Sequence, residues 1–295
     1  MMIYDMPLWR PPSEGPNLII QATIGCSFNA CTFCSMYKIK SYRQRPLEEV
    51  FADIEDAAQD WPDATRVFLA DGDALAVPTD DLEQILDKLI AEFPDLQRVT
   101  CYATPQNLTK KSVEDLQRLK DKRLNMVYLG IESGSDSMLK RIRKGSSKLM
   151  QKAMVRADEA GLKISATVIL GLGGKEHWRE HIEGTAALIN TVSPKFLSTL
   201  QLALEGGVEP EFREAFAKPD GSEFEWQDDA GILAELEYLL ELLKPEKAVI
   251  FRSNHASNAL ALAGNLPRDN EALLAQVRAA QSNAGSLRPQ WMRSL

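Results

Sequence analysis

The sequence lacks several features, and each shortage excludes a class of protein. No apolar run reaches the roughly 20 residues that a membrane-spanning helix needs, and the acidic residues and prolines of the first segment do not make a signal peptide. Basic residues number 34 against 42 acidic ones, for a net charge of −8. Because nucleic acids and membrane surfaces bind positive footprints, this balance argues against a nucleic-acid partner and against a membrane partner. We expect a cytoplasmic protein.

Cysteine is scarce too, but three of the four cysteines lie close together, at Cys26, Cys31 and Cys34. A cytosolic chain gains little from disulfides, so crowded thiols favour metal binding or redox chemistry. Three thiolates in one loop suit an iron–sulfur cluster better than zinc, which normally brings four donors, and better than incidental buried thiols. The fourth cysteine, Cys101, lies in a later predicted strand and is expected to be a core residue.

Short β-branched runs alternate with longer amphipathic stretches, as in the βα units of a parallel sheet. Strands are predicted over 17–23, 66–70, 99–103, 126–131, 164–170 and 196–202, and helices over 47–59, 80–92, 112–120, 149–160 and 176–190. This order predicts an α/β fold, an incomplete (β/α)6 barrel (a partial TIM barrel), with an open doubly wound sheet as the alternative.

The pattern changes after residue 204. Residues 205–229 are acidic and contain prolines and glycines, so we expect an irregular excursion or lid. A helix over 231–243, a strand over 248–252 and a last helix over 270–281 follow. We therefore expect an N-terminal extension over 1–16, a partial barrel over 17–204, and a C-terminal helical and strand extension over 205–295 that contributes to the substrate pocket.

The cysteine loop resembles that of the radical S-adenosylmethionine (radical SAM) superfamily. Its members carry three cysteines in a loop after the first strand of a partial barrel, with an aromatic residue before the last cysteine. Phe33 fills the aromatic place, although the first gap holds four residues (27–30) instead of the usual three. A loop absorbs such an insertion at small cost.

Three further stretches, ADGD (70–73), ESGS (132–135) and ILGLGG (169–174), follow predicted strands, at the edge where α/β sheets place their sites. The resemblance implies that residues in these stretches and Phe33 bind SAM, namely Phe33, Asp71, Gly72, Asp73, Glu132, Ser133, Ser135, Leu170 and Gly171. The chain is most similar to the Elongator/MiaB/NifB-type SAM domain, through 130–135 and the following Lys144. The chain also resembles an uncharacterised branch of this superfamily, which is marked by the stretches CTFCxMY, DGDAL and RSNHASN.

The resemblance also implies the activity. Cys26, Cys31 and Cys34 would hold a [4Fe-4S] cluster whose fourth iron chelates SAM. One electron, from a donor such as flavodoxin or ferredoxin, would cleave SAM to a 5′-deoxyadenosyl radical that abstracts hydrogen from an unidentified substrate. A small molecule is expected, because residues 205–295 contain no obvious basic RNA-binding module. The alternatives are a non-enzymatic iron–sulfur redox or sensor protein and a radical SAM tRNA-modifying enzyme.

Two polar motifs indicate function less specifically than the cysteine loop does. In RSNHASN (252–258), His255 is a candidate proton donor and Arg252 a candidate anion contact, with Asn254 and Asn258 as further substrate-binding candidates. The alternative is a turn network, because Ser and Asn favour turns.

The HWREH stretch (177–181) matches an inverted zinc-peptidase pattern but lacks a third ligand. We therefore favour a polar helix face, with Trp178 packed beside the sheet.

Four basic residues follow the cysteine loop. They are Lys38, Lys40, Arg43 and Arg45. They could neutralise the bound cofactors or bind an acidic redox partner, or they could form a solvated loop face.

Overall fold

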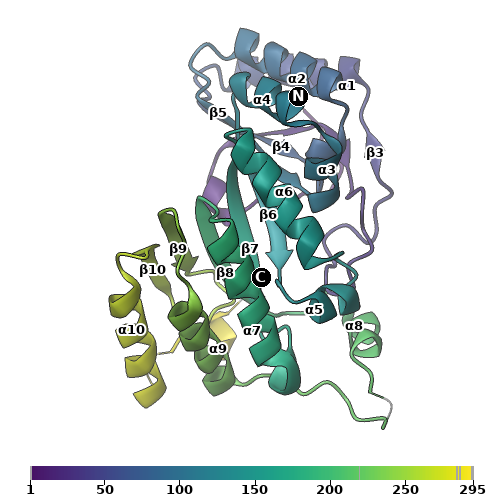
Figure 1. Cartoon of the computed structure of the whole chain (residues 1–295). Helices are drawn as coiled ribbons and strands as arrows, with labels where there is room; N and C mark the ends of the chain where they lie inside the picture. Colours follow the sequence, from purple (N-terminus) through teal and green to yellow (C-terminus); the bar gives the residue numbers. More distant parts are fainter. Residues whose placement is uncertain (1, 219, 284, 286, 294–295) are drawn as a thin grey trace. The chain divides into compact units, whose positions relative to one another are not determined.

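The computed structural model describes residues 2–218, 220–283, 285 and 287–293 (Figure 1). The chain divides into two compact units. The first comprises 1–29, 34–129 and 152–164, and the second comprises 30–33, 130–151 and 165–295. Among the described residues, no helix has both the length and the apolar character needed to span a membrane.

The strands of the first unit are parallel neighbours. They follow the order β1 (Leu18–Gln21), β4 (Arg66–Ala70), β5 (Arg98–Ala103) and β6 (Leu124–Glu132). In β4 the residues after Arg66 are all buried, which explains the continuous apolar sequence of a strand covered on both faces. A short antiparallel pair, β2 (Thr23–Ile24) and β3 (Arg43–Gln44), brackets the cysteine loop.

Helices connect these strands. They are α1 (Leu47–Asp60), α2 (Thr79–Glu92), α3 (Pro105–Lys110), α4 (Val113–Asp121) and α6 (Ser147–Glu159), with 3-10 turns at Pro12–Glu14 and Ala74–Ala76. The predicted cap of α4 is confirmed. The Ser112 hydroxyl accepts from the Asp115 amide at 3.0 Å, and the Asp115 carboxylate accepts from the Ser112 amide at 3.3 Å. This capping box satisfies two amide groups that the helix leaves unpaired.

In the second unit, β7 (Lys163–Leu170), β8 (Phe196–Gln201) and β9 (Val249–Ser253) are parallel, and β10 (Leu262–Leu266) is antiparallel to β9. The helices of this unit are α5 (Asp136–Arg141), α7 (Gly174–Thr191), α8 (Glu209–Ala215), α9 (Asp229–Leu242) and α10 (Asn270–Ser282), with a 3-10 turn at Gln290–Met292. Burial alternates along β8 and β9, so one face of these strands is covered and the other is partly exposed.

The predicted fold class is confirmed. The sheet is mainly parallel and not closed, in the order β1-β4-β5-β6-β7-β8-β9-β10. The C-terminal strand forecast at 248–252 joins this sheet as β9. The sequence analysis missed β10, because Leu262–Leu266 is short and contains Gly264 and Asn265, residues that are depleted in strands.

The expectation of an irregular segment over 205–229 was wrong in part. Residues Glu209–Ala215 form α8, and Phe212, Phe216 and Phe224 are buried in an apolar cluster with residues of α5 and of the end of β7. The acidic composition suggested a solvated loop, but the widely spaced phenylalanines anchor the segment in an apolar cluster that it shares with α5 and the end of β7.

Candidate functional site

The three clustered cysteines lie on the loop between β2 and β3. Cys26 and Cys34 are partly exposed, and Cys31 is 9% exposed. All four cysteines are described by the structure, and all are thiols rather than halves of a disulfide. The loop therefore offers three sulfur donors in the chemical form that metal ions bind.

Asn29 shows how the longer first gap is accommodated. Its backbone adopts φ = 42°, in the left-handed region that Asn tolerates better than most residues. Its amide nitrogen Nδ2 donates to the carbonyl oxygens of Tyr37 at 2.8 Å and Lys40 at 3.3 Å. These bonds tie the segment between the first two cysteines to the segment after the third, so the loop is held at its middle.

Cys101 has a different environment. It lies in β5 and is 1% exposed. Burial raises the pKa of its thiol well above the ordinary value, which keeps it protonated and unreactive. The prediction that this cysteine is a core residue is confirmed.

Asp71, at the end of β4, anchors the start of the cysteine loop. Its side chain is fully buried, and Oδ2 accepts from the Gly25 amide at 3.2 Å and from Lys40 Nζ at 3.0 Å. The Asp71 amide donates to Thr23 Oγ1 at 3.1 Å. Gly25, which immediately precedes Cys26, has φ = 72°, a conformation that favours glycine.

Asp73 ties the same loop to the next βα unit. Its buried carboxylate accepts from Ser27 Oγ and Asn107 Nδ2, and from Thr104 Oγ1 at 3.5 Å. Between the two aspartates, a Cβ on Gly72 would lie 2.4 Å from the Tyr37 ring, so only glycine permits this contact. The role of Asp71–Asp73 in binding SAM stays a prediction, and the structure gives these residues a second role, in shaping the cysteine loop.

The basic segment after the loop is not a free positive patch. Lys40 is 8% exposed and pairs with Asp71 and Asp5. Arg45 pairs with Asp53 at 2.5 Å and Glu49 at 3.4 Å. At least two of the four charges are therefore neutralised within the chain.

The Glu-Ser-Gly-Ser turn after β6 packs directly on α7. A Cβ on Gly134 would lie 2.1 Å from the Gly184 carbonyl oxygen, so both positions need glycine for the close approach. The Gly134 amide donates to Thr185 Oγ1 at 3.0 Å. The fully buried Ser133 hydroxyl lies 2.8 Å from His181 Nδ1.

The other two polar residues of this turn are also engaged. Ser135 caps α5 and its hydroxyl donates to Glu180 at 2.7 Å. Glu132 has φ = 59° and accepts from Lys144 Nζ at 3.1 Å. A Cβ on Gly130 would lie 2.0 Å from Glu132 Oε1, so a larger residue there would displace the Glu132 side chain. Contacts of Glu132, Ser133 and Ser135 with SAM stay predictions.

The HWREH helix segment is structural. His181 is fully buried, and its Nε2 lies 2.9 Å from the Ile169 carbonyl oxygen, so Nε2 carries the proton and Nδ1 accepts from Ser133. Burial lowers the pKa of His181 to about 4, so it is neutral near pH 7. Both ring nitrogens are occupied, which leaves none for zinc. Trp178 packs on Tyr238 of α9, with ring centroids 5.8 Å apart, and its packing beside the sheet stays a prediction.

The turn after β7 rests on α9. Gly171 has φ = 81°, and its amide donates to Glu235 Oε2 at 2.7 Å. Glu235 is fully buried, and burial raises the pKa of its carboxyl group to about 7. The preceding Leu170 is 1% exposed. The sequence analysis missed Glu235 and the structural role of His181, because both lie on helices and meet the turns only through tertiary packing.

The RSNHASN motif divides into two groups. Asn258 is 3% exposed and bonds to the Thr199 carbonyl oxygen at 2.7 Å, the Gln201 amide at 2.8 Å and Ser253 Oγ at 3.0 Å. These contacts hold the motif on β8, as the turn-network alternative expects. Asn254 is exposed.

His255 is half-buried. Its Nδ1 accepts from the Ser257 amide at 3.2 Å and lies 2.9 Å from Ser257 Oγ. Burial and the nearby Arg288 guanidinium lower the pKa of His255. The Arg288 guanidinium also donates to the carbonyl oxygens of His255 at 2.9 Å and Ala256 at 2.8 Å. Catalysis by His255 stays a prediction.

Phe33 belongs to the second unit. It packs against the apolar cluster that contains Leu139, Ile142 and Ile169, and Lys144 Nζ lies 6.0 Å from its ring centroid. The Thr32 amide donates to the Ile142 carbonyl oxygen at 3.2 Å. Phe33 is thus fixed by packing, and its contact with SAM stays a prediction.

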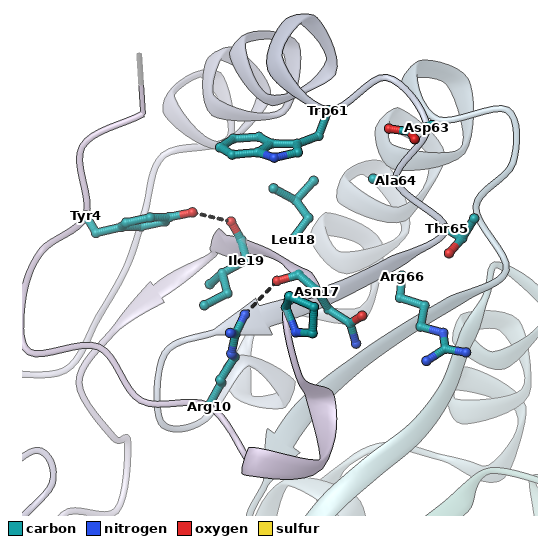
Figure 2. A pocket seen from close by; sticks show the side chains of 11 residues that line it. Tyr4, Arg10, Asn17, Leu18, Ile19, Trp61, Asp63, Ala64, Thr65 and Arg66 are labelled. Carbon is teal, nitrogen blue, oxygen red and sulfur yellow. Dashed lines mark hydrogen bonds between the residues drawn. The ribbon is translucent and has the colours of Figure 1, made fainter.

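A cavity of about 340 Å³ lies at the amino ends of β1 and β4, the end opposite the Asp71–Asp73 turn (Figure 2). Tyr4 donates to the Ile19 carbonyl oxygen at 2.8 Å, and Arg10 donates to the Asn17 carbonyl oxygen at 2.7 Å. Trp61 covers one side. This cavity is not at the strand ends where α/β folds place their chemistry.

The chemistry of the donor set fits a [4Fe-4S] cluster, and within the described part of the chain no three His, Cys, Asp or Glu side chains are grouped so as to hold a single metal ion. Three thiols stand on one loop, and the loop is anchored through Gly25, Asn29 and Thr32. Sulfur donors match iron, and three of them leave one iron of a four-iron cluster for another ligand. Cys101 is a core residue and supplies no fourth donor.

Comparison with known proteins agrees with this chemistry. Residues 20–189 match the Radical SAM superfamily model. The chain is 25% identical over 260 residues to the tRNA-2-methylthio-N(6)-dimethylallyladenosine synthase of Bordetella avium, covering 82% of this chain and 51% of the relative. It is 27% identical over 193 residues to the Bordetella petrii synthase, and this match covers 62% of this chain and 39% of that relative. The chain therefore spans about half, or less, of the length of these relatives.

Solved structures share the fold. Coproporphyrinogen III oxidase (HemN) from Escherichia coli, a radical SAM enzyme, matches with a TM-score of 0.57 at 15% identity, covering 76% of this chain and 51% of that one. The radical SAM methyltransferase TsrM from Kitasatospora setae, solved with cobalamin and a [4Fe-4S] cluster, also matches with a TM-score of 0.57. The identity is 14%, and the match covers 90% of this chain and 61% of TsrM. Because the family model covers more than half of the chain, the protein belongs to the radical SAM superfamily and is an enzyme of the class that uses a [4Fe-4S] cluster and SAM.

Proposed function

We propose that this enzyme cleaves SAM reductively at a cluster held by Cys26, Cys31 and Cys34, and acts on a small-molecule substrate in the cytoplasm. The observation that carries the proposal is the anchored loop with three sulfur donors, in contrast to the fourth cysteine, which is buried in the core. Flavodoxin or ferredoxin is the proposed class of electron donor.

When bound, the cluster and SAM supply a 5′-deoxyadenosyl radical that abstracts hydrogen from the substrate. The chain contributes position and exclusion of water. Asp71 and Asp73 hold the start of the cysteine loop. SAM contacts Phe33 and three turns, namely Asp71–Asp73, Glu132–Ser135 and Leu170–Gly171. Residues 205–295 complete the substrate pocket. His255, Asn254 and Asn258 are candidates there, with Asn258 acting through the turn that it holds.

The test is SAM cleavage by the anaerobically reconstituted protein with dithionite. Wild type is expected to release 5′-deoxyadenosine, and Cys26→Ala, Cys31→Ala and Cys34→Ala to release none above background. Cys101→Ala is the matched control and should retain both cluster and cleavage. Cleavage by Cys26→Ala would overturn the assignment, and methylthioadenosine as the product would show that a different sulfonium bond breaks.

A tRNA-modifying role is the second candidate, because the names of the curated relatives are those of tRNA-modifying synthases. The net charge of −8 and the internal pairing of Lys40 and Arg45 favour a small molecule. Gel-shift titration of bulk tRNA with the reconstituted enzyme at physiological salt distinguishes the two. Binding that falls steeply with salt, together with tRNA-stimulated SAM cleavage, would favour tRNA.

A further inference from the structure

The open face of the second unit carries a row of polar side chains that the proposed SAM chemistry does not use. In the parallel register, Thr167 of β7 is the partner of Ser198 of β8, and Ser198 is the partner of Arg252 of β9. Residues in register on neighbouring parallel strands point to the same side of a sheet, and neighbouring strands lie about 4.8 Å apart. The three side chains therefore form one row across β7, β8 and β9.

The row lies on a face that the chain leaves open. Thr167, Ser198 and Arg252 are all partly exposed, although each lies inside a strand. Their neighbours along the strands, which point the other way, are fully buried, among them Ala166, Leu197 and Phe251. The hydroxyls and the guanidinium are thus accessible to a bound molecule.

The polar groups of this row have few partners within the protein. Arg252 donates to the carbonyl oxygens of Phe251 at 2.7 Å and Gly264 at 3.2 Å, and within the described part of the chain it has no carboxylate partner. The hydroxyls of Thr167 and Ser198 likewise have no hydrogen-bond partner among the described side chains and backbone groups. A cation without a counter-ion among the described residues, on the same sheet face as two unused hydroxyls, matches the chemistry of an oxyanion.

The surroundings of the row are mostly apolar. The preceding row on the same face contains the buried Ser165 with Phe196 and Ile250, and the following row contains Ile169 and Leu200. Ile169 belongs to the apolar cluster against which Phe33 of the cysteine loop packs. An ion pair beside apolar side chains is stronger than one in open water. The same-face neighbours also fit an uncharged portion of a ligand on either side of its anionic group.

We infer that Thr167, Ser198 and Arg252 bind an anionic group, a carboxylate or a phosphate, of the enzyme's small-molecule substrate. This inference rests on the proposed function, because it assigns the open face of the strands to the substrate of the radical reaction. Arg252 supplies the charge and a planar pair of donors, and the two hydroxyls supply further hydrogen bonds that fix the orientation of the anion.

The test measures anion binding to the reconstituted enzyme with SAM and without dithionite, so that no SAM is cleaved. The probes are inorganic phosphate, followed by ³¹P NMR, and succinate, followed by calorimetry. Wild type is expected to bind at least one of them, and Arg252→Gln to bind it at least about tenfold more weakly. Arg252→Lys should bind the anion with intermediate affinity, because lysine keeps the positive charge and lacks the planar pair of donors of the guanidinium. Ser198→Ala and Thr167→Val should each weaken binding about two- to fivefold.

Arg268→Gln is the matched control, because Arg268 is an exposed arginine outside the row and pairs with Asp269. It should bind the probes as wild type does. Tighter binding of phosphate than succinate would assign a phosphate-bearing substrate, and the reverse would assign a carboxylate. Circular dichroism and thermal unfolding establish that each variant is folded.

The inference is overturned if wild type binds neither probe, or if folded Arg252→Gln binds them as wild type does. It is also overturned if Arg252→Gln weakens tRNA binding without changing the affinity for either small anion. Wild-type SAM cleavage is measured separately. Its absence would overturn the proposed function while the anion affinities still decide the assignment of the row.

Discussion

The two faces of β8 and β9 treat polar side chains in opposite ways. On the covered face, Ser253 and the backbone of Thr199 and Gln201 bond to Asn258, so the chain pairs these polar groups internally, whereas the buried Thr199 Oγ1 has no partner among the described residues. On the open face, Ser198 and Arg252 make few internal bonds. Residues adjacent in one motif, Arg252 and Ser253, thus have different tasks because side chains alternate along a strand. Buried polar groups stabilise the fold, and open ones are available to ligands.

Among the buried polar groups, Asp71 at the end of β4 is expected to give the largest stability effect. Asp71→Ala removes a fully buried carboxylate and leaves Lys40 and the Gly25 amide without this partner. Breaking a buried ion pair costs about 3–5 kcal/mol, so guanidinium unfolding should show a loss of that order. The exposed Asp63→Ala is the control. A loss below about 1 kcal/mol would show that the pair does not organise the loop.

Glu235, a second buried polar group, makes the stability of the fold sensitive to pH. Its folded pKa of about 7 lies above its ordinary value of 4.5, so between these values the folded state binds more protons than the unfolded state. Stability therefore falls as the pH rises from about 4.5 through 7. The total is on the order of 3 kcal/mol, since each pKa unit corresponds to about 1.4 kcal/mol.

Unfolding free energies of wild type and Glu235→Gln, measured from pH 5 to pH 8, test this coupling. The difference in unfolding free energy between the two proteins should change across that range. For Glu271→Gln, on the exposed side of α10, the unfolding free energy should change with pH as it does for wild type. Parallel curves for wild type and Glu235→Gln would contradict the raised pKa.

Asn258 tests the covered side of the RSNHASN motif directly. Asn258→Ala leaves the Thr199 carbonyl group and the Gln201 amide without their partner, and a buried unsatisfied group costs about 1–3 kcal/mol. Thermal unfolding should report a loss of about 2 kcal/mol. Asn254→Ala, at an exposed position of the same motif, should be nearly neutral. Equal effects of the two substitutions would remove the distinction between the covered and open groups.

The smallest effect is expected on the open side. Ser198→Ala should change the free energy of unfolding by less than about 0.5 kcal/mol, because the hydroxyl makes no internal bond among the described residues. Urea unfolding of the reconstituted protein measures it. A loss of 2 kcal/mol or more would mean that Ser198 supports the fold and would break the comparison.

The main alternation of strands and helices was predictable because the predicted strands are short apolar or β-branched runs and the predicted helices have apolar spacing. The Arg66–Ala70 strand matches its predicted bounds, and Ser112 caps its helix as expected. The cysteine loop was also readable, since three thiols in one loop have few other uses. These features depend on residues that are close in the sequence.

What could not be predicted depends on contacts between distant segments. The bond of Glu235 to Gly171 joins residues far apart in the chain, and nothing in the local sequence of α9 signals it. The role of His181 in holding Ser133 is of the same kind. The row of Thr167, Ser198 and Arg252 needs the register of three strands, which the separate strand sequences do not specify.

The central assignment is most directly tested by the EPR spectrum of the anaerobically reconstituted, dithionite-reduced protein before and after addition of SAM. A cluster held by three cysteines has an iron that SAM can bind, so SAM should change the spectrum of wild type and of Cys101→Ala, and 5′-deoxyadenosine should accumulate in the same samples. A reduced cluster whose spectrum SAM leaves unchanged, with no 5′-deoxyadenosine formed, would contradict the assignment and favour an electron carrier or sensor.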